Sequence, residues 1–398
     1  MKKILLIGNA NNESYRLAKY LEYMNISTTI ILLTKGSLDD PGVFKNLFSK
    51  NRLISYLDWR NYDEEDIIVN FIHFKQMIQK WAKDFDLIIG NQHGIALLSN
   101  LDKPVIILNT GSDLTYYCNE NFIDVRTSTW SNSFKSSPEG LDRISAYKSF
   151  RSNQISTFKE SFGIITLPVG LSASTDSTLR QIGCENSKRF SLITGTNLMK
   201  IHGTNNRSRL PLSHFRKRIF VGSRLVNSDS AHSDLDDKGS NILYSFIEQI
   251  LHLKLNLEFN FFNKGNLAPT FFKMIQGSRS HISFKLHNEL RYDQYVKLLL
   301  KSDLIIDSLG KSVPARVSHD ALSNLKLVLC NISKENQIYR YGNANLNFIG
   351  ADNIDDFVHI ISNLNRIKDE KTTQGLNAEQ VSYIFDPIRQ VDLILSSI

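Results

Sequence analysis

Two residues that can exchange a proton follow successive apolar runs in the first half of this sequence. His93 comes shortly after the run Asp86–Gly90, and Asp113 comes shortly after Pro104–Asn109. If both runs are strands of one parallel sheet, the two side chains point into the same cleft, where either could position or deprotonate a hydroxyl group. The plain alternatives are a structural histidine and, because Asp113 ends a Gly-Ser-Asp sequence, a helix N-cap.

A second group of residues has the pattern of an anion site. Gly310, Lys311 and Ser312 precede a helix that is predicted to begin near Ala315. The first backbone N–H groups of a helix have no partner within the helix, so they can hold a phosphate group.

Other kinds of site find little support. Histidine and acidic residues are scattered, so no metal site is predicted, and no carboxylate pair has glycosidase-like spacing. The three cysteines, Cys118, Cys184 and Cys330, contain no CxxC pair. They predict neither a disulfide framework nor a zinc site, and they fit a reducing cytoplasm.

The composition is that of an ordinary globular protein. Of the 398 residues, 41% are hydrophobic and 22% charged, and no apolar run is long enough to span a membrane. The net charge of +7 favours anionic partners such as nucleotide phosphates or acidic lipids. Nucleic acid is not expected, because the basic residues form no stripe interleaved with aromatic ones.

The elements that would position these residues alternate between short β-rich runs and stretches of helical spacing. This alternation predicts an α/β fold with parallel sheets. The predicted strands are Lys3–Ile7, Thr28–Leu33, Asp86–Gly90, Pro104–Asn109, Gly163–Leu167, Phe190–Thr194, Arg218–Gly222, Leu257–Phe262, His281–Phe284, Asp303–Asp307, Lys326–Cys330 and Leu346–Ile349.

The series of strands restarts near residue 215, after the polar and basic segment His202–Arg209. We therefore predict two Rossmann-like domains, residues 1–208 and 209–382, with the C-terminal segment 383–398 joining the first. The cleft between the domains is the expected ligand site. Thr127–Gly140, rich in Ser, Thr and Asn, is expected to form an exposed loop.

In the second half, the segment around Gly222 and Arg224 and the pair Lys238-Gly239 resemble the large GT-B family of retaining glycosyltransferases. The resemblance implies two facing Rossmann-like domains, and it implies that Arg224 and Lys238 bind the diphosphate of the donor. Two fixed cations suit that role, because charge builds on the departing diphosphate. An insertion, Asn227–Asp237, separates the two, and solvated surface charges are the alternative.

Two further segments resemble the donor side of that family. His281–Leu290 is similar to the segment beside the nucleobase, which assigns His287 and Leu290 to donor binding; an exposed loop histidine is the alternative. Asp320 stands where the family has the second of two glutamates, so it would bind ribose hydroxyls. Ser312 replaces the first glutamate, and a solvated first-turn acid is the alternative for Asp320.

The first half resembles the acceptor side. The segments around His93 and Asp113 are similar to those that face the acceptor, and so is the loop that contains Gly8, Asn9, Asn11 and Asn12. That loop lacks the Gly-x-Gly-x-x-Gly pattern of dinucleotide-binding proteins.

The resemblance implies a cytoplasmic, metal-independent enzyme without a cofactor. It would transfer a sugar, with retention, from a nucleoside-diphosphate sugar to a hydroxyl of a saccharide or lipid-linked acceptor, as in polysaccharide biosynthesis. A nucleotide-sugar epimerase of the UDP-N-acetylglucosamine 2-epimerase type and a non-catalytic sugar- or nucleotide-binding homologue are the alternatives. Contact with an anionic inner membrane face is also expected, from Arg151, Lys159, Arg207, Arg209, Arg216, Lys217 and Arg218.

Overall fold

The structure is a computed structural model that describes residues 2–33, 40–44, 52–166, 173–192, 216–223, 225, 239–276, 281–288, 290, 292–310, 314–341, 346–374 and 384–397. The chain divides into two compact units, Met1–Thr194 together with Pro387–Ile398, and Gly195–Asp386. The first unit therefore ends before residue 208, where the sequence predicts the boundary, and it includes the last helix of the chain.

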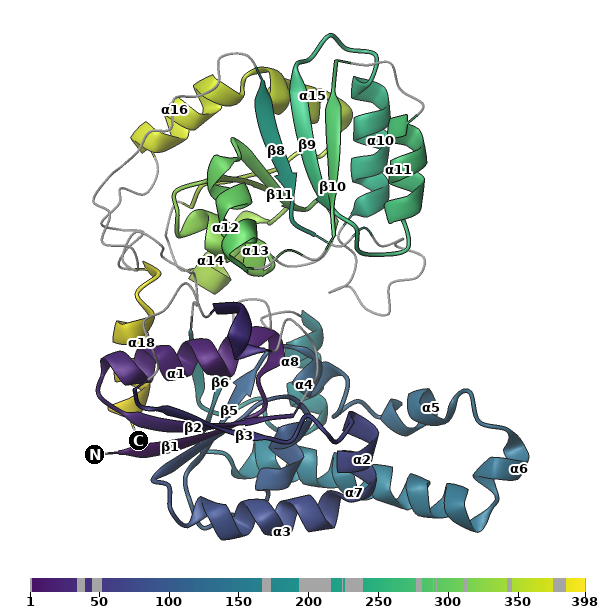
Figure 1. Ribbon diagram of the computed structural model, residues 1–398, viewed down its shortest axis with the longest axis vertical. Helices are drawn as coiled ribbons and strands as arrows, with labels where there is room; N and C mark the ends of the chain where they lie inside the picture. Colours follow the sequence, from purple (N-terminus) through teal and green to yellow (C-terminus); the bar gives the residue numbers. More distant parts are fainter. Residues whose placement is uncertain are drawn as a thin grey trace. The chain divides into compact units, whose positions relative to one another are not determined.

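The first unit is built on a parallel sheet of seven strands in the order β3-β2-β1-β4-β5-β6-β7. Its central strands are apolar and buried because helices cover both faces (Figure 1). The strands are β1 (Lys3–Ile7), β2 (Ser27–Leu32), β3 (Ile54–Asp58), β4 (Leu87–Gly90), β5 (Val105–Asn109), β6 (Gly163–Thr166) and β7 (Arg189–Ser191).

The helices of the first unit follow the expected βα alternation. The α-helices are α1 (Glu13–Tyr23), α2 (Glu64–Val69), α3 (Phe71–Ala82), α4 (Ser112–Thr115), α5 (Phe122–Thr127), α6 (Asn132–Lys135), α7 (Pro138–Glu160), α8 (Ala173–Gln181) and α18 (Pro387–Leu395). Short 3₁₀ segments are η1 (Ala10–Asn12), η3 (Pro41–Phe44) and η4 (Gln92–Leu98). The C-terminal helix α18 packs on α1.

One prediction in this unit is wrong. The segment Thr127–Gly140, expected to be an exposed loop, contains α6 and the start of α7. Ser131 and Ser137 cap these two helices by accepting N–H bonds, so the serines that suggested a loop mark helix starts instead. Figure 1 shows α6 near the amino end of α7, away from the sheet, whereas α5 lies beside α7.

The second unit repeats the arrangement with a parallel sheet of six strands in the order β10-β9-β8-β11-β12-β13. Its core joins one sheet face to the helices α10, α11 and α15. The strands are β8 (Lys217–Val221), β9 (Leu257–Phe262), β10 (Ser283–His287), β11 (Leu304–Ser308), β12 (Leu327–Cys330) and β13 (Phe348–Ile349). The helices are α10 (Ser240–Ile250), α11 (Ala268–Gln276), α12 (Tyr292–Lys301), α13 (Arg316–Leu322), α14 (Lys334–Tyr341), α15 (Ile354–Ser362) and α16 (Leu364–Gln374).

Candidate functional site

Both sheets reverse their direction of strand addition at one point. In the first unit this switch lies between β1 and β4, and in the second it lies between β8 and β11. Ligands of open parallel sheets bind beyond the carboxyl ends of the strands at such a point, because the connections leave in opposite directions and open a crevice. The topology therefore selects one edge in each unit.

At the first switch point, the backbones after β1 and β4 are in close contact. Gly8 has a φ of +86°, and a Cβ added there would lie 2.5 Å from the carbonyl oxygen of Asn91. The Asn91 side chain accepts the N–H of Ala10 at 2.8 Å and donates to the Leu108 carbonyl at 2.8 Å. Gly8 is required for this approach, and Asn91 joins the ends of β1, β4 and β5.

The polar residues of the predicted acceptor loop are buried and bonded to one another. Asn9 donates to the side chain of Asn12 at 2.7 Å and accepts the N–H of Tyr15 at 2.9 Å. Asn12 takes a left-handed φ of 60° and donates to the Asp40 carbonyl at 3.1 Å. Asn11 lies in the same 3₁₀ turn, η1. The loop is thus held in shape by its own amide groups.

Asp113 is fully buried at the end of β5, where it holds the turn into α4. Its carboxylate accepts the backbone N–H of Thr110 at 2.7 Å and the Thr110 hydroxyl at 3.0 Å, and Asn91 Nδ2 lies 3.4 Å away. Burial raises the pKa of Asp113 to about 6, against the lowering effect of these bonds. Asp113 is the second residue of α4 and bonds back to Thr110, so it fixes the turn before the helix without being an N-cap, and a role in proton transfer stays a prediction.

His93 follows β4 and is 1% exposed, with its ring in an edge-to-face contact with Tyr117 at 6.3 Å between centroids. Neither ring nitrogen has a hydrogen-bond partner among the residues that the structure describes. Burial lowers the pKa of His93 to about 4, so the imidazole is neutral at pH 7. A neutral ring with unused nitrogens can accept a hydroxyl proton or hydrogen bond.

At the second switch point, three glycines bring two strand ends and a helix start together. A Cβ on Gly239, whose φ is +66°, would lie 2.3 Å from the backbone nitrogen of Gly310. A Cβ on Gly222 would lie 2.4 Å from the Val317 side chain in α13. The start of α10 therefore approaches the end of β11, and the end of β8 approaches α13, at places where Gly239 and Gly222 leave no room for a side chain.

The start of α13 differs from the expectation that its backbone N–H groups are available to a phosphate. Asp307, the buried penultimate residue of β11, accepts the N–H of Ala315 at 2.6 Å and the hydroxyl of Ser318. Asp307 bonds the residue before the helix rather than the first N–H groups of α13, but a carboxylate so close to the helix start repels an anion. The start of α10 has no acid in its first turn.

Asp320 is 2% exposed, so it is not a solvated acid of the first turn. It accepts the hydroxyl of Tyr295 at 3.1 Å and lies 3.3 Å from Arg316 Nε. A ribose would have to displace one of these partners, and ribose binding by Asp320 stays a prediction.

His287 is the last residue of β10 rather than an exposed loop histidine. Its Nε2 is 2.9 Å from Asn260 Oδ1 on β9, and burial, followed by the charge of Lys285, lowers its pKa. Leu290 is half-buried in the segment after that strand. The other predicted donor residues, Arg224, Lys238, Lys311 and Ser312, lie outside the described residues.

No protein-family description matches this sequence, and no curated protein does. Among solved structures, the chain is similar to sucrose-phosphate synthase from Thermosynechococcus elongatus, at 12% identity and a TM-score of 0.62, over 100% of this chain and 98% of that one. It is similar to TarM at 13% identity and a TM-score of 0.53, over 100% of this chain and 98% of that one. It is similar to UDP-GlcNAc 2-epimerase from Methanocaldococcus jannaschii at 15% identity and a TM-score of 0.52, over 100% of both chains.

The fold is of the GT-B class. These identities are low, so the likeness establishes the architecture and leaves the activity to be argued from the site. The predicted α/β fold with two Rossmann-like units is confirmed. The epimerase from Methanocaldococcus jannaschii has also been solved in complex with UDP-GlcNAc and UDP.

The sequence analysis did not single out three of the residues that shape these GT-B switch points. The sequence contains a signal for Asn91, because this residue directly follows a predicted buried strand and lies two residues before His93. Asp307 ends a predicted strand in the same way. Gln154 had none: it lies within α7, and its amide donates to the carbonyls of Gln92 at 3.2 Å and Asp113 at 3.0 Å.

Within the described residues, no group of three or more His, Cys, Asp or Glu side chains could hold a metal ion. Among the helices that the structure describes, none is both long and apolar enough to cross a membrane.

Proposed function

We propose that this protein is a glycosyltransferase that binds a nucleoside-diphosphate sugar at the switch point of its second unit. The observation that carries the proposal is the close approach of Gly239, at the start of α10, to the backbone of Gly310 after β11. Backbone without side chains lets a diphosphate approach closely, and the positive end of an 11-residue helix stabilises its charge.

The same site suits the leaving group of a glycosyl transfer. Lys238 and Lys311 are the sequence neighbours of Gly239 and Gly310, whose backbones are in contact. Together with Arg224 they supply the cations that we propose to neutralise the departing diphosphate, without a metal ion. His287 and Leu290 would lie beside the nucleobase, and Asp320 would bind the ribose after a shift of its partners.

We propose that the acceptor hydroxyl binds at the first switch point, beside His93. A neutral imidazole with no other hydrogen-bond partner can orient that hydroxyl and take its proton. Asn9, Asn12 and Asn91 would shape the acceptor side, and Asp113 would support it through the turn after β5. We propose a saccharide or lipid-linked acceptor, transfer with retention, and a cytoplasmic location, with peripheral contact with an anionic membrane.

A nucleotide-sugar 2-epimerase is the second candidate, because UDP-GlcNAc 2-epimerase shares the fold. An epimerase needs no acceptor, so it converts UDP-GlcNAc alone, whereas a transferase retains the donor until an acceptor is added. The third candidate is a non-catalytic homologue, suggested by Ser312 in the place of an acid.

The test is a thermal-shift screen of the full chain with UDP, GDP and ADP, followed by incubation of the matching nucleotide sugar with and without saccharide acceptors. We expect one nucleotide to raise the melting temperature and product to form only with an acceptor. Conversion without acceptor would favour the epimerase, binding without turnover would favour the homologue, and absence of nucleotide binding would refute all three.

A further inference from the structure

The amino ends of β8, β9 and β10 carry a pocket that the proposed transfer reaction does not use. Its volume is about 560 Å³, and its lining residues are Arg216, Lys254, Asn256, His281, Ile282 and Ser283. These residues precede or begin their strands, whereas Gly222 and His287 lie at the carboxyl ends. Five parallel-strand residues span roughly 16 Å, so the pocket is separate from the donor edge.

Two of the lining side chains, Arg216 and Lys254, are cationic, and none of the lining residues that the structure describes is acidic. Arg216 donates its Nε–H to Asn256 Oδ1 at 3.0 Å, which orients the guanidinium group. Within the part of the chain that the structure describes, Lys254 and His281 form no ion pair. The positive charge of Lys254 is therefore not neutralised by an ion pair within those residues, and the apolar wall at Ile282 strengthens the field that a ligand meets.

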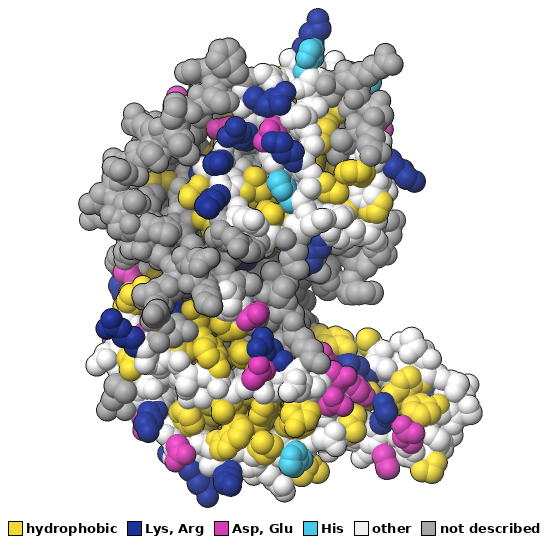
Figure 2. Space-filling view, viewed as in Figure 1, with side chains coloured by type: hydrophobic (Ala, Val, Ile, Leu, Met, Phe, Trp, Pro, Cys, Tyr) yellow, Lys and Arg dark blue, Asp and Glu magenta, His cyan; other side chains and the backbone are white. Residues whose placement is uncertain are grey.

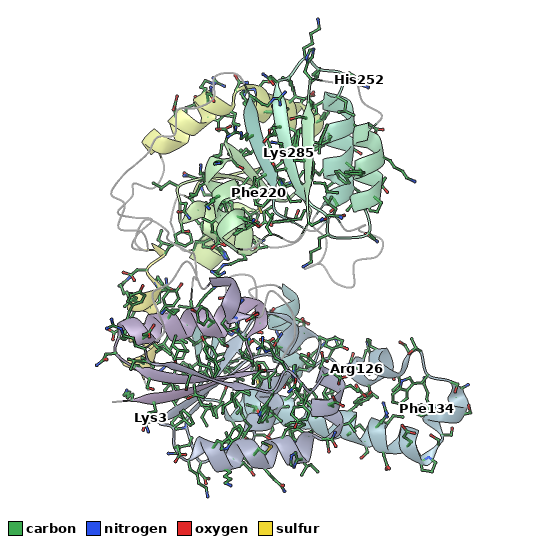
Figure 3. The ribbon with its side chains drawn as sticks, viewed as in Figure 1. Lys3, Arg126, Phe134, Phe220, His252 and Lys285 are labelled. Atoms are coloured by element: carbon green, nitrogen blue, oxygen red, sulfur yellow. The ribbon has the colours of Figure 1, made fainter. Side chains whose placement is uncertain are left out.

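Two acids on the same sheet face are already engaged, because Asp303 accepts the N–H of Arg218 and Glu258 lies between two cations. Glu258 lies 2.8 Å from Lys285 Nζ and 3.8 Å from Arg218 Nε, in a row that crosses the three strands. Side chains alternate between the faces of a strand, so Arg218, Glu258 and Lys285 lie on the same side as Arg216, Asn256 and Ser283. Figure 2 shows basic side chains gathered around an acidic group on the face over these strands, and Figure 3 labels Lys285 there.

We propose that this pocket binds a phosphate or diphosphate group, carried either by a soluble metabolite or by a lipid headgroup. An oriented guanidinium pairs with phosphate oxygens in a bidentate manner, and an ammonium group beside it adds a second charge-assisted hydrogen bond. The site is independent of the glycosyl-transfer proposal, because it shares no residue with the donor edge.

Isothermal titration of the full chain with inorganic pyrophosphate tests the proposal, and variants of the lining residues assign the binding to this pocket rather than to the donor edge. The double variant Lys254→Gln/His281→Gln should weaken pyrophosphate binding by about tenfold or more, because it removes the Lys254 cation and the N–H donor of His281. Both positions are exposed, so the fold should persist. Lys273→Gln, which removes an equally exposed charge from α11, is the matched control and should bind like the wild type.

Sedimentation with vesicles separates the two sources of phosphate. Binding to phosphatidic acid vesicles that the double variant loses would assign a lipid headgroup, whereas pyrophosphate binding alone would assign a soluble ligand. Equal affinity of the wild type and the double variant for both probes would overturn the proposal, whatever nucleotide binding the donor edge shows.

Discussion

At the scale of single residues, His93 and Asp113 are buried at neighbouring strand ends, and burial moves their pKa values in opposite directions. The pKa of His93 falls from 6.5 to about 4, and that of Asp113 rises from 3.8 to about 6. Between pH 4 and 6, Asp113 is therefore protonated in the folded protein but ionised in the unfolded chain. In the same pH range, His93 is neutral in the folded protein but protonated in the unfolded chain. The two contributions to stability have opposite slopes and offset each other.

Single substitutions should reveal how each residue contributes to the pH dependence of the free energy of unfolding. Relative to the wild type, Asp113→Asn should lose stability as the pH falls from 6 to 4, because a term that favours folding at low pH is removed. His93→Gln should gain stability relative to the wild type as the pH falls from 6.5 to 4. Each change is on the order of 3 kcal/mol, from a shift of roughly two pKa units. Urea unfolding at a series of pH values measures both, and parallel curves for all three proteins would contradict the assignment.

Asn91 is the residue on which the first switch point depends. Asn91→Ala leaves the N–H of Ala10 and the carbonyl of Leu108 without their buried partner, so we expect a loss of about 2–4 kcal/mol in the free energy of unfolding. Asn132→Ala, at an exposed position of α6, is the control and should change the free energy by less than about 0.5 kcal/mol. Chemical denaturation compares them, and equal losses would mean that Asn91 does not join the strand ends.

At the scale of elements, the second switch point depends on how closely the start of α10 approaches the end of β11. Gly239 contributes a left-handed backbone conformation and leaves room for Gly310. Asp307, in β11, accepts the N–H of Ala315, the residue before α13. A carboxylate therefore lies close to the start of α13, whereas α10 has no acid in its first turn.

Comparing Gly239→Ala with Gly183→Ala separates the cost of backbone strain from the cost of a steric clash with a neighbouring segment. Both glycines have a positive φ, +66° and +72°, but the nearest atom to a Cβ on Gly183 is 3.9 Å away, against 2.3 Å for Gly239. Gly183→Ala should cost about 1 kcal/mol from backbone strain alone. Gly239→Ala should cost more and should also reduce the thermal shift produced by a nucleoside diphosphate. A nucleotide-induced shift equal to that of the wild type would remove this edge from the donor site.

At the scale of the whole molecule, the chain returns to the first unit after completing the second. The terminal helix α18 buries Val391 and Ile394, and it packs on α1, the helix that follows the first strand. The two ends of the chain are therefore part of one core.

Ile394→Ala tests whether the packing of α18 on α1 stabilises the first unit, and Leu393→Ala is the control. Ile394 is 3% exposed and Leu393 is 57% exposed, although they are adjacent in the same helix. We expect Ile394→Ala to cost about 2–5 kcal/mol and Leu393→Ala less than about 0.5 kcal/mol. Hydrogen exchange should show loss of protection in α1 for the first variant only. Unchanged protection in both would mean that α18 does not stabilise the first unit.

Prediction from sequence succeeded where the signal is local. Apolar runs identified β1 and β9 with their observed bounds and most other strands to within two residues, because a strand buried on both faces is continuously hydrophobic. It failed at β3, where only Ile54 and Leu57 are partly buried, and at α7, where turn-forming residues precede the helix.

The sequence by itself determined the α/β class, the repeated unit and the residues that follow each strand, since these depend on hydrophobic periodicity along the chain. Only the tertiary structure decided which of those residues meet. Asn91 bonds Ala10 across 81 positions, and Asp307 bonds the N–H of Ala315 just before α13. Such contacts depend on strand order and on the approach of separate backbones, which no local pattern encodes.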